Sequence, residues 1–172
     1  MRWIPVGKVP RTHGLKGELK FFPYDAGESI IRSLKNVKLG DGREADKEWQ
    51  VESLRGKHSR RIIKFKGLDS IEAAQPLAGQ TVHIRQGDFE KLPEGEYYWF
   101  EIEGLKAYDD AGKYYGMVEE IILTGSNDVY VVRDGDRELL LPMIESVIHT
   151  IDLAEGKLIF HIVEGLIEND SV

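Results

Sequence analysis

The chain has 172 residues, no cysteine and a formal net charge of −7. Without cysteine there is no disulfide and no thiolate chemistry, which favours a cytoplasmic protein. The N-terminal residues lack the apolar run of a signal peptide, and no later run is long enough to span a bilayer, so we expect no membrane association.

Charge is distributed unevenly along the chain. Residues 1–90 carry 17 Lys and Arg against 12 Asp and Glu, a net of +5, whereas residues 91–172 carry 6 against 18, a net of −12. This asymmetry indicates a polyanionic partner for the first half and a basic partner for the second. The alternative is that both halves are simply solvated surfaces.

Short strands separated by turns are predicted in the first half. Residues 6–9 and 18–22 flank a glycine-bearing loop, which is typical of a hairpin. Further strands are predicted at residues 37–39, 48–54, 61–66 and 81–85. Strands at this near-regular spacing predict a small β-barrel.

One short helix is predicted within this barrel. Asp69 is placed to cap it, and Glu72 stands at the third helical position, which is capping-box spacing. Pro76 removes one intrahelical hydrogen bond, and Gly79 is placed to end the helix. We therefore expect a helix of one or two turns.

The loop between the first two strands contains Gly14-Leu-Lys-Gly17, the GxxG spacing of KH domains. In a KH domain this loop joins two helices, whereas its neighbours here are predicted strands, so no KH module is expected. Two interpretations remain. The loop is a hairpin connection that requires glycine, or it contacts RNA or protein through Arg11, His13 and Lys16.

Residues 55–66 form a basic segment without any acidic residue. Its cations are Arg55, Lys57, Arg60, Arg61, Lys64 and Lys66. Such a segment is either a solvated loop and strand, or an exposed face that neutralises phosphates and binds RNA in a salt-sensitive way. The candidates for RNA or ribosome contact are Arg60, Arg61 and Lys64.

An aromatic segment, residues 97–100, begins the second half. In a strand, Tyr97 and Trp99 would share one face, and Tyr98 and Phe100 the other. One face can fill a core, and the second must be covered by the chain or by a partner. The rings are therefore either core packing or interface anchors.

The rest of the second half again predicts strands and turns, with Asp134-Gly135 as a favoured hairpin pair. The strands are expected at residues 105–108, 114–123, 129–133, 138–141, 147–153 and 157–163. Its acidic side chains are candidates for contact with a basic partner: Glu101, Glu103, Asp109, Asp110, Glu119 and Glu120. The two halves predict domains at residues 1–88 and 97–166, a linker at 89–96 and a tail at 167–172.

No catalytic motif is found in the sequence. The five histidines are scattered without H-E-x-x-H or paired metal-ligand spacing, and no G-x-S-x-G nucleophile motif occurs. We expect no enzyme, no metal and no cofactor. An enzyme with an unrecognised site is kept as a third interpretation.

Several motifs resemble the RimM family of small-subunit maturation factors, in the right order over nearly the whole chain. They are Gly7-Lys-Val9, His13-Gly-Leu-Lys-Gly-Glu-Leu19, Phe65-Lys-Gly67, Ile102-Glu-Gly-Leu105, Thr124-Gly-Ser-Asn-Asp-Val129, Leu141-Pro142 and Glu164-Gly-Leu166. The resemblance implies an all-β protein with a six-stranded translation-factor-like barrel, carrying the short helix, and then a barrel of the PRC type. It also implies a non-enzymatic assembly factor.

The resemblance further implies partners. They are the small-subunit head protein numbered nineteen, and the immature small subunit with its rRNA, which the factor helps to process or fold. The family's aromatic pair, associated with ribosome binding, maps onto Tyr97 and Tyr98, with one position of slippage against Trp99. We expect a monomer that binds the head protein through these rings, Glu101 and Glu103. The alternative is a stand-alone RNA-binding protein with the second barrel as a dimerisation module.

Overall fold

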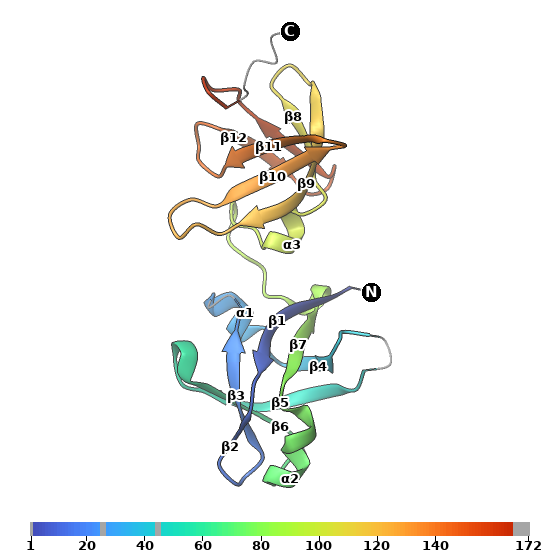
Figure 1. Cartoon of the computed structure of the whole chain (residues 1–172), viewed down its shortest axis with the longest axis vertical. Coiled ribbons are helices and arrows are strands. Elements are labelled where there is room, and N and C mark those ends of the chain that lie inside the picture. The colour runs from blue at the N-terminus through green and yellow to red at the C-terminus, as the bar shows by residue number, and fades with distance from the viewer. Residues whose placement is uncertain (1, 25–26, 44–45, 167–172) are drawn as a thin grey trace. The chain divides into compact units, whose positions relative to one another are not determined.

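The computed structural model describes residues 2–24, 27–43 and 46–166. The chain divides between Pro93 and Glu94 into two compact units, the first unit and the second unit (Figure 1). The predicted tail, residues 167–172, lies outside the described residues. No helix in the described part of the chain is long and apolar enough to cross a membrane.

The first unit is a closed antiparallel barrel. Its strands are β1 (Trp3–Val9), β2 (Thr12–His13), β3 (Glu18–Pro23), β4 (Asn36–Gly40), β5 (Glu48–Arg55), β6 (Arg61–Phe65) and β7 (Gln80–Arg85). They follow the order β1-β7-β4-β5-β6-β3-β2, and an additional β1–β3 pairing closes six of them into a ring. The expected six-stranded barrel is confirmed.

Two glycines allow this barrel to close. Gly7 lies opposite Pro23 where β1 meets β3, and a Cβ there would lie 2.6 Å from the ring of Phe21. Gly17 ends the β2–β3 loop with φ of +82°, and a Cβ there would collide with the carbonyl oxygen of Leu68. Glycine is therefore required at both positions by close backbone approach, and at Gly17 also by its left-handed conformation.

The predicted helix of the first unit is α2 (Ile71–Ala74), continued by the 3-10 turn η2 (Gln75–Leu77). The expected cap is displaced by one residue: Ser70 is the N-cap, and its Oγ accepts a hydrogen bond from Ala73 N at 3.2 Å. Asp69 instead accepts from Lys64 Nζ at 2.7 Å. The unit also contains elements that the sequence patterns did not predict, namely α1 (Glu28–Arg32), η1 (His58–Arg60) and η3 (Gln86–Asp88).

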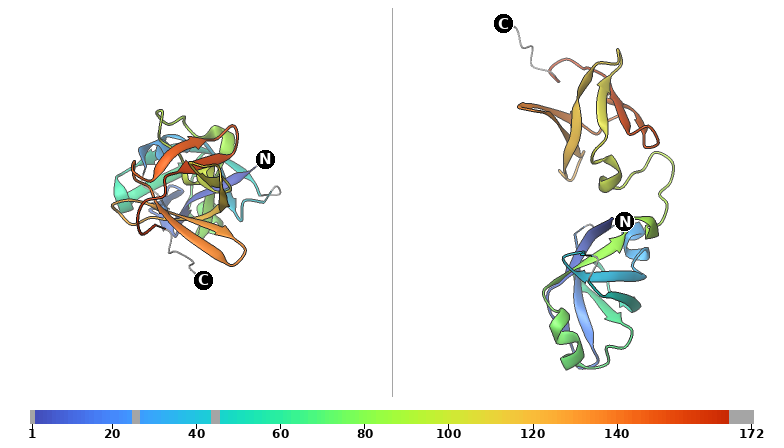
Figure 2. Two further views of the ribbon diagram at one scale, coloured as in Figure 1. Left: turned by 90° about the horizontal axis from the view of Figure 1, so that it is seen from above. Right: turned by 90° about the vertical axis from the view of Figure 1, so that its right-hand side faces the viewer.

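The second unit is a six-stranded sheet, coloured yellow to red in Figure 2. It encloses one hydrophobic core. It contains α3 (Trp99–Ile102), β8 (Lys106–Asp109), β9 (Tyr114–Ile122), β10 (Val129–Asp134), β11 (Arg137–Pro142), β12 (Ile148–Asp152) and β13 (Lys157–Phe160). The order is β11-β10-β9-β8-β13-β12, and the β8–β13 pair is parallel. All six strands coincide closely with predicted ones.

Strand geometry at the aromatic segment was the wrong expectation, because residues 99–102 form the single-turn helix α3. The Glu101 carboxylate accepts a hydrogen bond from Tyr98 N at 2.9 Å, and Glu101 N donates to Tyr98 O at 3.0 Å. This is the glutamate half of a capping box, which satisfies a backbone donor at the start of the turn. The x-x-Glu spacing after Tyr98 was the local signal for a helix start.

Candidate protein- and RNA-contact surfaces

The aromatic side chains of the α3 segment divide into buried and half-buried rings. Tyr98 and Phe100 are 8% and 4% exposed, and their rings stack at 5.1 Å with an interplanar angle of 9°. Trp99 is half-buried and meets Phe100 edge-on at 5.7 Å. Tyr97 is half-buried against the core of the second unit. Tyr98 is therefore a packing residue, whereas Tyr97 and Trp99 keep accessible surface.

Of the two acidic candidates in this segment, Glu101 is engaged in capping α3 and Glu103 is half-buried directly after the helix. Only part of the Glu101 carboxylate can contact a partner, because one of its oxygens accepts a hydrogen bond from the Tyr98 backbone N–H. The segment thus offers a partner two half-buried rings and little free negative charge.

Tyr130 lies in the core beside this segment and is 2% exposed. Burial raises the pKa of Tyr130 to about 12, with smaller contributions from Asp128 and Tyr97. A neutral phenol is therefore enclosed in the core at physiological pH. Its titration makes the stability of the second unit sensitive to alkaline pH.

Stability should fall as the pH rises from about 10 to 12, because an unfolded Tyr130 ionises in this range while the buried phenol stays neutral. The unfolded state then binds fewer protons, so the free energy of unfolding falls by up to about 3 kcal/mol for a shift of this size. Urea unfolding at several alkaline pH values measures the slope. The Tyr130→Phe variant should show a shallower slope, and equal slopes would contradict the assignment.

Asp109 was expected on the acidic surface, and that expectation is wrong. It is 6% exposed, and its Oδ1 accepts hydrogen bonds from Ala111 N and Lys113 N, each at 2.9 Å. The hydroxyl of Tyr115 donates to Oδ2 at 3.1 Å. These hydrogen bonds, that from Lys113 first, lower the pKa of Asp109. Asp109 thus fixes the turn between β8 and β9.

Strands β9, β10 and β11 present a face away from the core. Tyr130 and Val132 belong to the core, so Val131 and Arg133 project from the opposite side of β10. Val131 is itself buried, at 1% exposed, and adds no accessible surface there. Their cross-strand neighbours lie on that side too, and Glu119 stands at a β-bulge in β9. The outer face is defined as the accessible residues of this side: Met117, Glu119, Glu120, Ile122, Arg133, Glu138 and Leu140.

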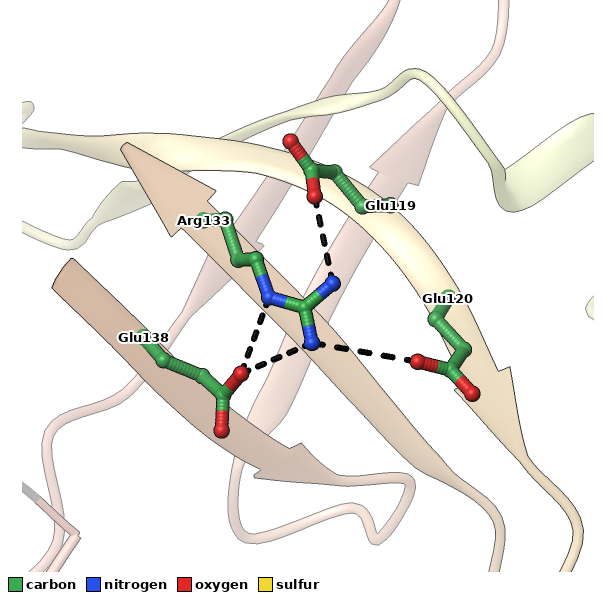
Figure 3. A network of polar contacts seen from close by, with 4 residues as sticks. All are labelled: Glu119, Glu120, Arg133 and Glu138. Carbon is green, nitrogen blue, oxygen red and sulfur yellow. Dashed lines mark hydrogen bonds and ion pairs between the residues drawn. The ribbon is translucent and has the colours of Figure 1, made fainter. Parts of the chain in front are cut away.

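Three glutamates of the outer face surround Arg133 (Figure 3). Glu138 Oε2 accepts from Nε at 2.9 Å and lies 2.8 Å from Nη2, and Glu119 Oε2 accepts from Nη1 at 3.2 Å. Glu120 Oε2 lies 3.9 Å from Nη2. Three carboxylates against one guanidinium leave this cluster with a formal charge of −2. All four side chains are 37–57% exposed, so their field reaches a partner through solvent.

Apolar side chains accompany the acids on the outer face. Met117 is 40%, Ile122 is 42% and Leu140 is 48% exposed. Apolar side chains bordered by charged ones are typical of protein interaction sites. The sequence predicts Glu119 and Glu120 on an acidic surface but not these three apolar residues, because alternation in a strand does not tell which face is outward when both faces carry apolar residues.

In the first unit, two of the predicted RNA-contacting cations, Arg61 and Lys64, are paired with carboxylates. Arg61 is 8% exposed and lies 3.3 Å from Glu28 Oε1. Lys64 lies 2.7 Å from Asp69 and 2.9 Å from Glu52, and these hydrogen bonds, that of Asp69 first, raise the pKa of Lys64. The side chains of β6 alternate between buried and half-buried, and Arg61 lies on the buried side with Ile63 and Phe65.

The β2–β3 loop brings further cations to the same part of the barrel. In the strand register, His13 lies opposite Glu18 and Glu18 lies opposite Lys64, so the three residues form one cross-strand row. Arg55 donates to both oxygens of Glu18 and lowers the pKa of that carboxyl. Arg11 and Lys16 are exposed at this loop, as is Arg60 at η1. These three offer the most accessible positive charge among the predicted contacts.

Two small β-barrels in series, the first with a basic sequence and the second with an open acidic and apolar sheet face, define a two-domain all-β protein. The chain belongs to the RimM family, since residues 4–89 match the RimM N-terminal domain and residues 99–166 match the RimM PRC barrel domain. The resemblance noted in the sequence motifs is confirmed.

Named relatives cover nearly the full chain. The chain is 42% identical to "Ribosome maturation factor RimM" of Thermotoga maritima, over 91% of this chain and 89% of that relative. It is 37% identical to the protein of the same name from Geobacter metallireducens, over 96% and 95%. A solved structure of a 16S ribosomal RNA processing protein RimM from Pseudomonas aeruginosa has 29% identity, covers 94% of this chain and 98% of its own, and gives a TM-score of 0.46.

Proposed function

We propose that this chain is a non-enzymatic assembly factor for the small ribosomal subunit, and that its second unit binds a basic protein of the subunit head. The observation that carries the proposal is the outer face, where a cluster of formal charge −2 stands beside exposed Met117, Ile122 and Leu140. The names of the relatives support a role in ribosome maturation.

The two components of the outer face have different effects on binding. Carboxylates attract a cationic protein, which speeds encounter and disfavours acidic partners more than it adds affinity. Apolar side chains supply affinity once water is excluded from them. A basic protein that presents an apolar residue among its cations would satisfy both parts of the face.

A second copy of the chain is the alternative occupant of this face, as in an RNA-binding protein that dimerises through its second unit. The exposed apolar side chains favour this interpretation. A symmetric contact, however, would bring two clusters of formal charge −2 together, and like charges across an interface are costly. We therefore propose a monomer with a basic protein partner.

The proposal is tested by calorimetric titration of the full chain with the purified head protein at low and moderate salt. We expect one-to-one binding that weakens as salt increases, because exposed charges are screened. Sedimentation of the free chain at the same concentrations reports dimerisation. A dimer with no affinity for the head protein would support the alternative and refute the proposal.

For the first unit we propose contact with small-subunit rRNA through its accessible cations, Arg11, Lys16 and Arg60, with His13 at the loop base. Arg60→Gln should lower the slope of log affinity against log salt by about one for each phosphate that the protein no longer neutralises. Lys64→Gln is the matched control, and it should change the slope less because Lys64 is already paired with Asp69 and Glu52. Equal slopes for wild type and Arg60→Gln would remove this residue from the RNA surface.

A further inference from the structure

Asp110, His149 and His161 form a cluster on the second unit. One potential ligand atom from each of the three side chains lies within 4.8 Å of the other two. The residues belong to three strands that are neighbours in the sheet, since Asp110 follows β8, His161 follows β13 and His149 lies within β12. The sheet itself therefore brings them together.

Strand register explains this convergence. Asp109 lies opposite Phe160 in the parallel β8–β13 pair, so the next residues, Asp110 and His161, are neighbours. His161 Nδ1 lies 2.5 Å from Asp110 Oδ2, and the backbone N–H of His161 donates to Val147 O at 2.7 Å. The backbone hydrogen bond holds the His161 backbone in place, and the side-chain contact keeps its ring beside Asp110.

A β-bulge places the third residue. Ile148 pairs with Phe160 and Thr150 with Ile159, so His149 is the extra residue between them. A bulge redirects the side chain of its extra residue. The rings of His149 and His161 lie with centroids 4.7 Å apart.

We propose that Asp110, His149 and His161 bind a divalent transition-metal ion, Zn²⁺ in the first instance, through two imidazole nitrogens and one carboxylate oxygen. This donor set is one that Zn²⁺ and its neighbours in the first transition series accept. Three protein ligands leave a coordination position for water or for a side chain of a partner. The net charge of −12 in residues 91–172 favours cation binding.

The geometry requires only a small rearrangement, in which the Asp110–His161 pair at 2.5 Å opens and the longer separations, up to 4.8 Å, close. Bonds of about 2.0–2.2 Å in a tetrahedral site place ligand atoms roughly 3.4 Å apart. The side chains of His161 and Asp110 are 40% and 51% exposed, so they can rotate by the needed distance without disturbing the core. The site lies on β8, β13 and β12, whereas the outer face is formed by β9, β10 and β11, so metal binding goes beyond the proposed function.

The test is a calorimetric titration of metal-depleted, tag-free full chain with Zn²⁺ at neutral pH, together with Co²⁺ uptake followed by visible absorption. We expect one equivalent of each metal to bind. His149→Gln and His161→Gln should each weaken Zn²⁺ binding at least tenfold, while His58→Gln in the first unit should leave it unchanged. Uptake should also weaken as the pH falls, because protons compete for the imidazole nitrogens.

Circular dichroism of the metal-free variants provides the folding control, since all three side chains are at the surface. Failure of the folded, metal-depleted chain to take up Zn²⁺ saturably at micromolar concentration would overturn the proposal. So would Zn²⁺ binding of equal strength in wild type and the His149→Gln, His161→Gln double variant. In either case the contact between His161 and Asp110 would be an ordinary surface ion pair.

Discussion

Reversing two charges of the outer face should reduce affinity for the basic head protein by about a hundredfold while leaving the fold intact. Glu119→Lys with Glu138→Lys changes the formal charge of the Arg133 cluster from −2 to +2. Like charges placed across an interface cost several kcal/mol, and roughly 3 kcal/mol corresponds to this loss of affinity. The free energy of unfolding should change by about 1 kcal/mol or less, because exposed ion pairs contribute little to stability.

The kinetics give a second readout for the same pair of substitutions. Association should slow most at low salt, and the salt dependence of the association rate should reverse in sign, because attraction is replaced by repulsion. Surface plasmon resonance at several ionic strengths measures both the rates and the affinity.

A matched control separates this local effect from the overall charge of the chain. Glu155→Lys with Glu164→Lys makes the same change in net charge at exposed positions in and after the β12–β13 hairpin, at the other edge of the sheet. We expect at most a few-fold loss of affinity for this control. If control and test variants lose affinity equally, the partner senses net charge alone and the outer face is not its binding site.

The strands could be predicted because two simple signals agree along most of the chain. In β6, buried Arg61, Ile63 and Phe65 alternate with side chains of the opposite face, as the period of a strand requires. Turns supplied the second signal, since Asp134-Gly135 joins β10 to β11 in the expected hairpin. Where the alternation of buried and exposed residues agrees with the turn residues, neighbouring residues alone are enough to predict the strands.

The α3 segment was mispredicted because two local signals conflict there. Aromatic residues favour strands, whereas the backbone hydrogen bonds of Glu101 favour a helical turn. Only the packing of Tyr98 on Phe100 shows which signal dominates. Packing of buried side chains thus outweighs the strand preference of the four aromatic residues 97–100.

The surfaces were less predictable because they depend on register between distant strands. Asp110 and His161 are 51 residues apart, and only the parallel β8–β13 pairing makes them neighbours. Similarly, the charge run does not show that pairing with β5 brings Glu52 to Lys64, or that Asp69 in the segment after β6 also reaches it. A charge run in sequence thus becomes an alternating charge pattern once the strands pair.

Tyr98→Ala should destabilise the second unit by about 3 kcal/mol, which is within the range for removing a buried aromatic ring. Tyr98 is 8% exposed and stacks on Phe100 at 5.1 Å, so truncation removes a buried ring and the stacking contact of Phe100. Urea unfolding of the full chain measures the change. Tyr98→Phe keeps the stacked ring and should cost no more than about 1 kcal/mol.

This result decides how the Tyr97 and Tyr98 pair is to be interpreted. If Tyr98→Ala unfolds the second unit, loss of ribosome binding in a Tyr97, Tyr98 double variant reports loss of structure and not the removal of a binding residue. Trp99→Ala, which removes a half-buried ring, is then the informative test of partner binding in this segment. If Tyr98→Ala instead leaves the stability unchanged and weakens partner binding, Tyr98 is an interface anchor. Its stacking on Phe100 then contributes little to the stability of the second unit.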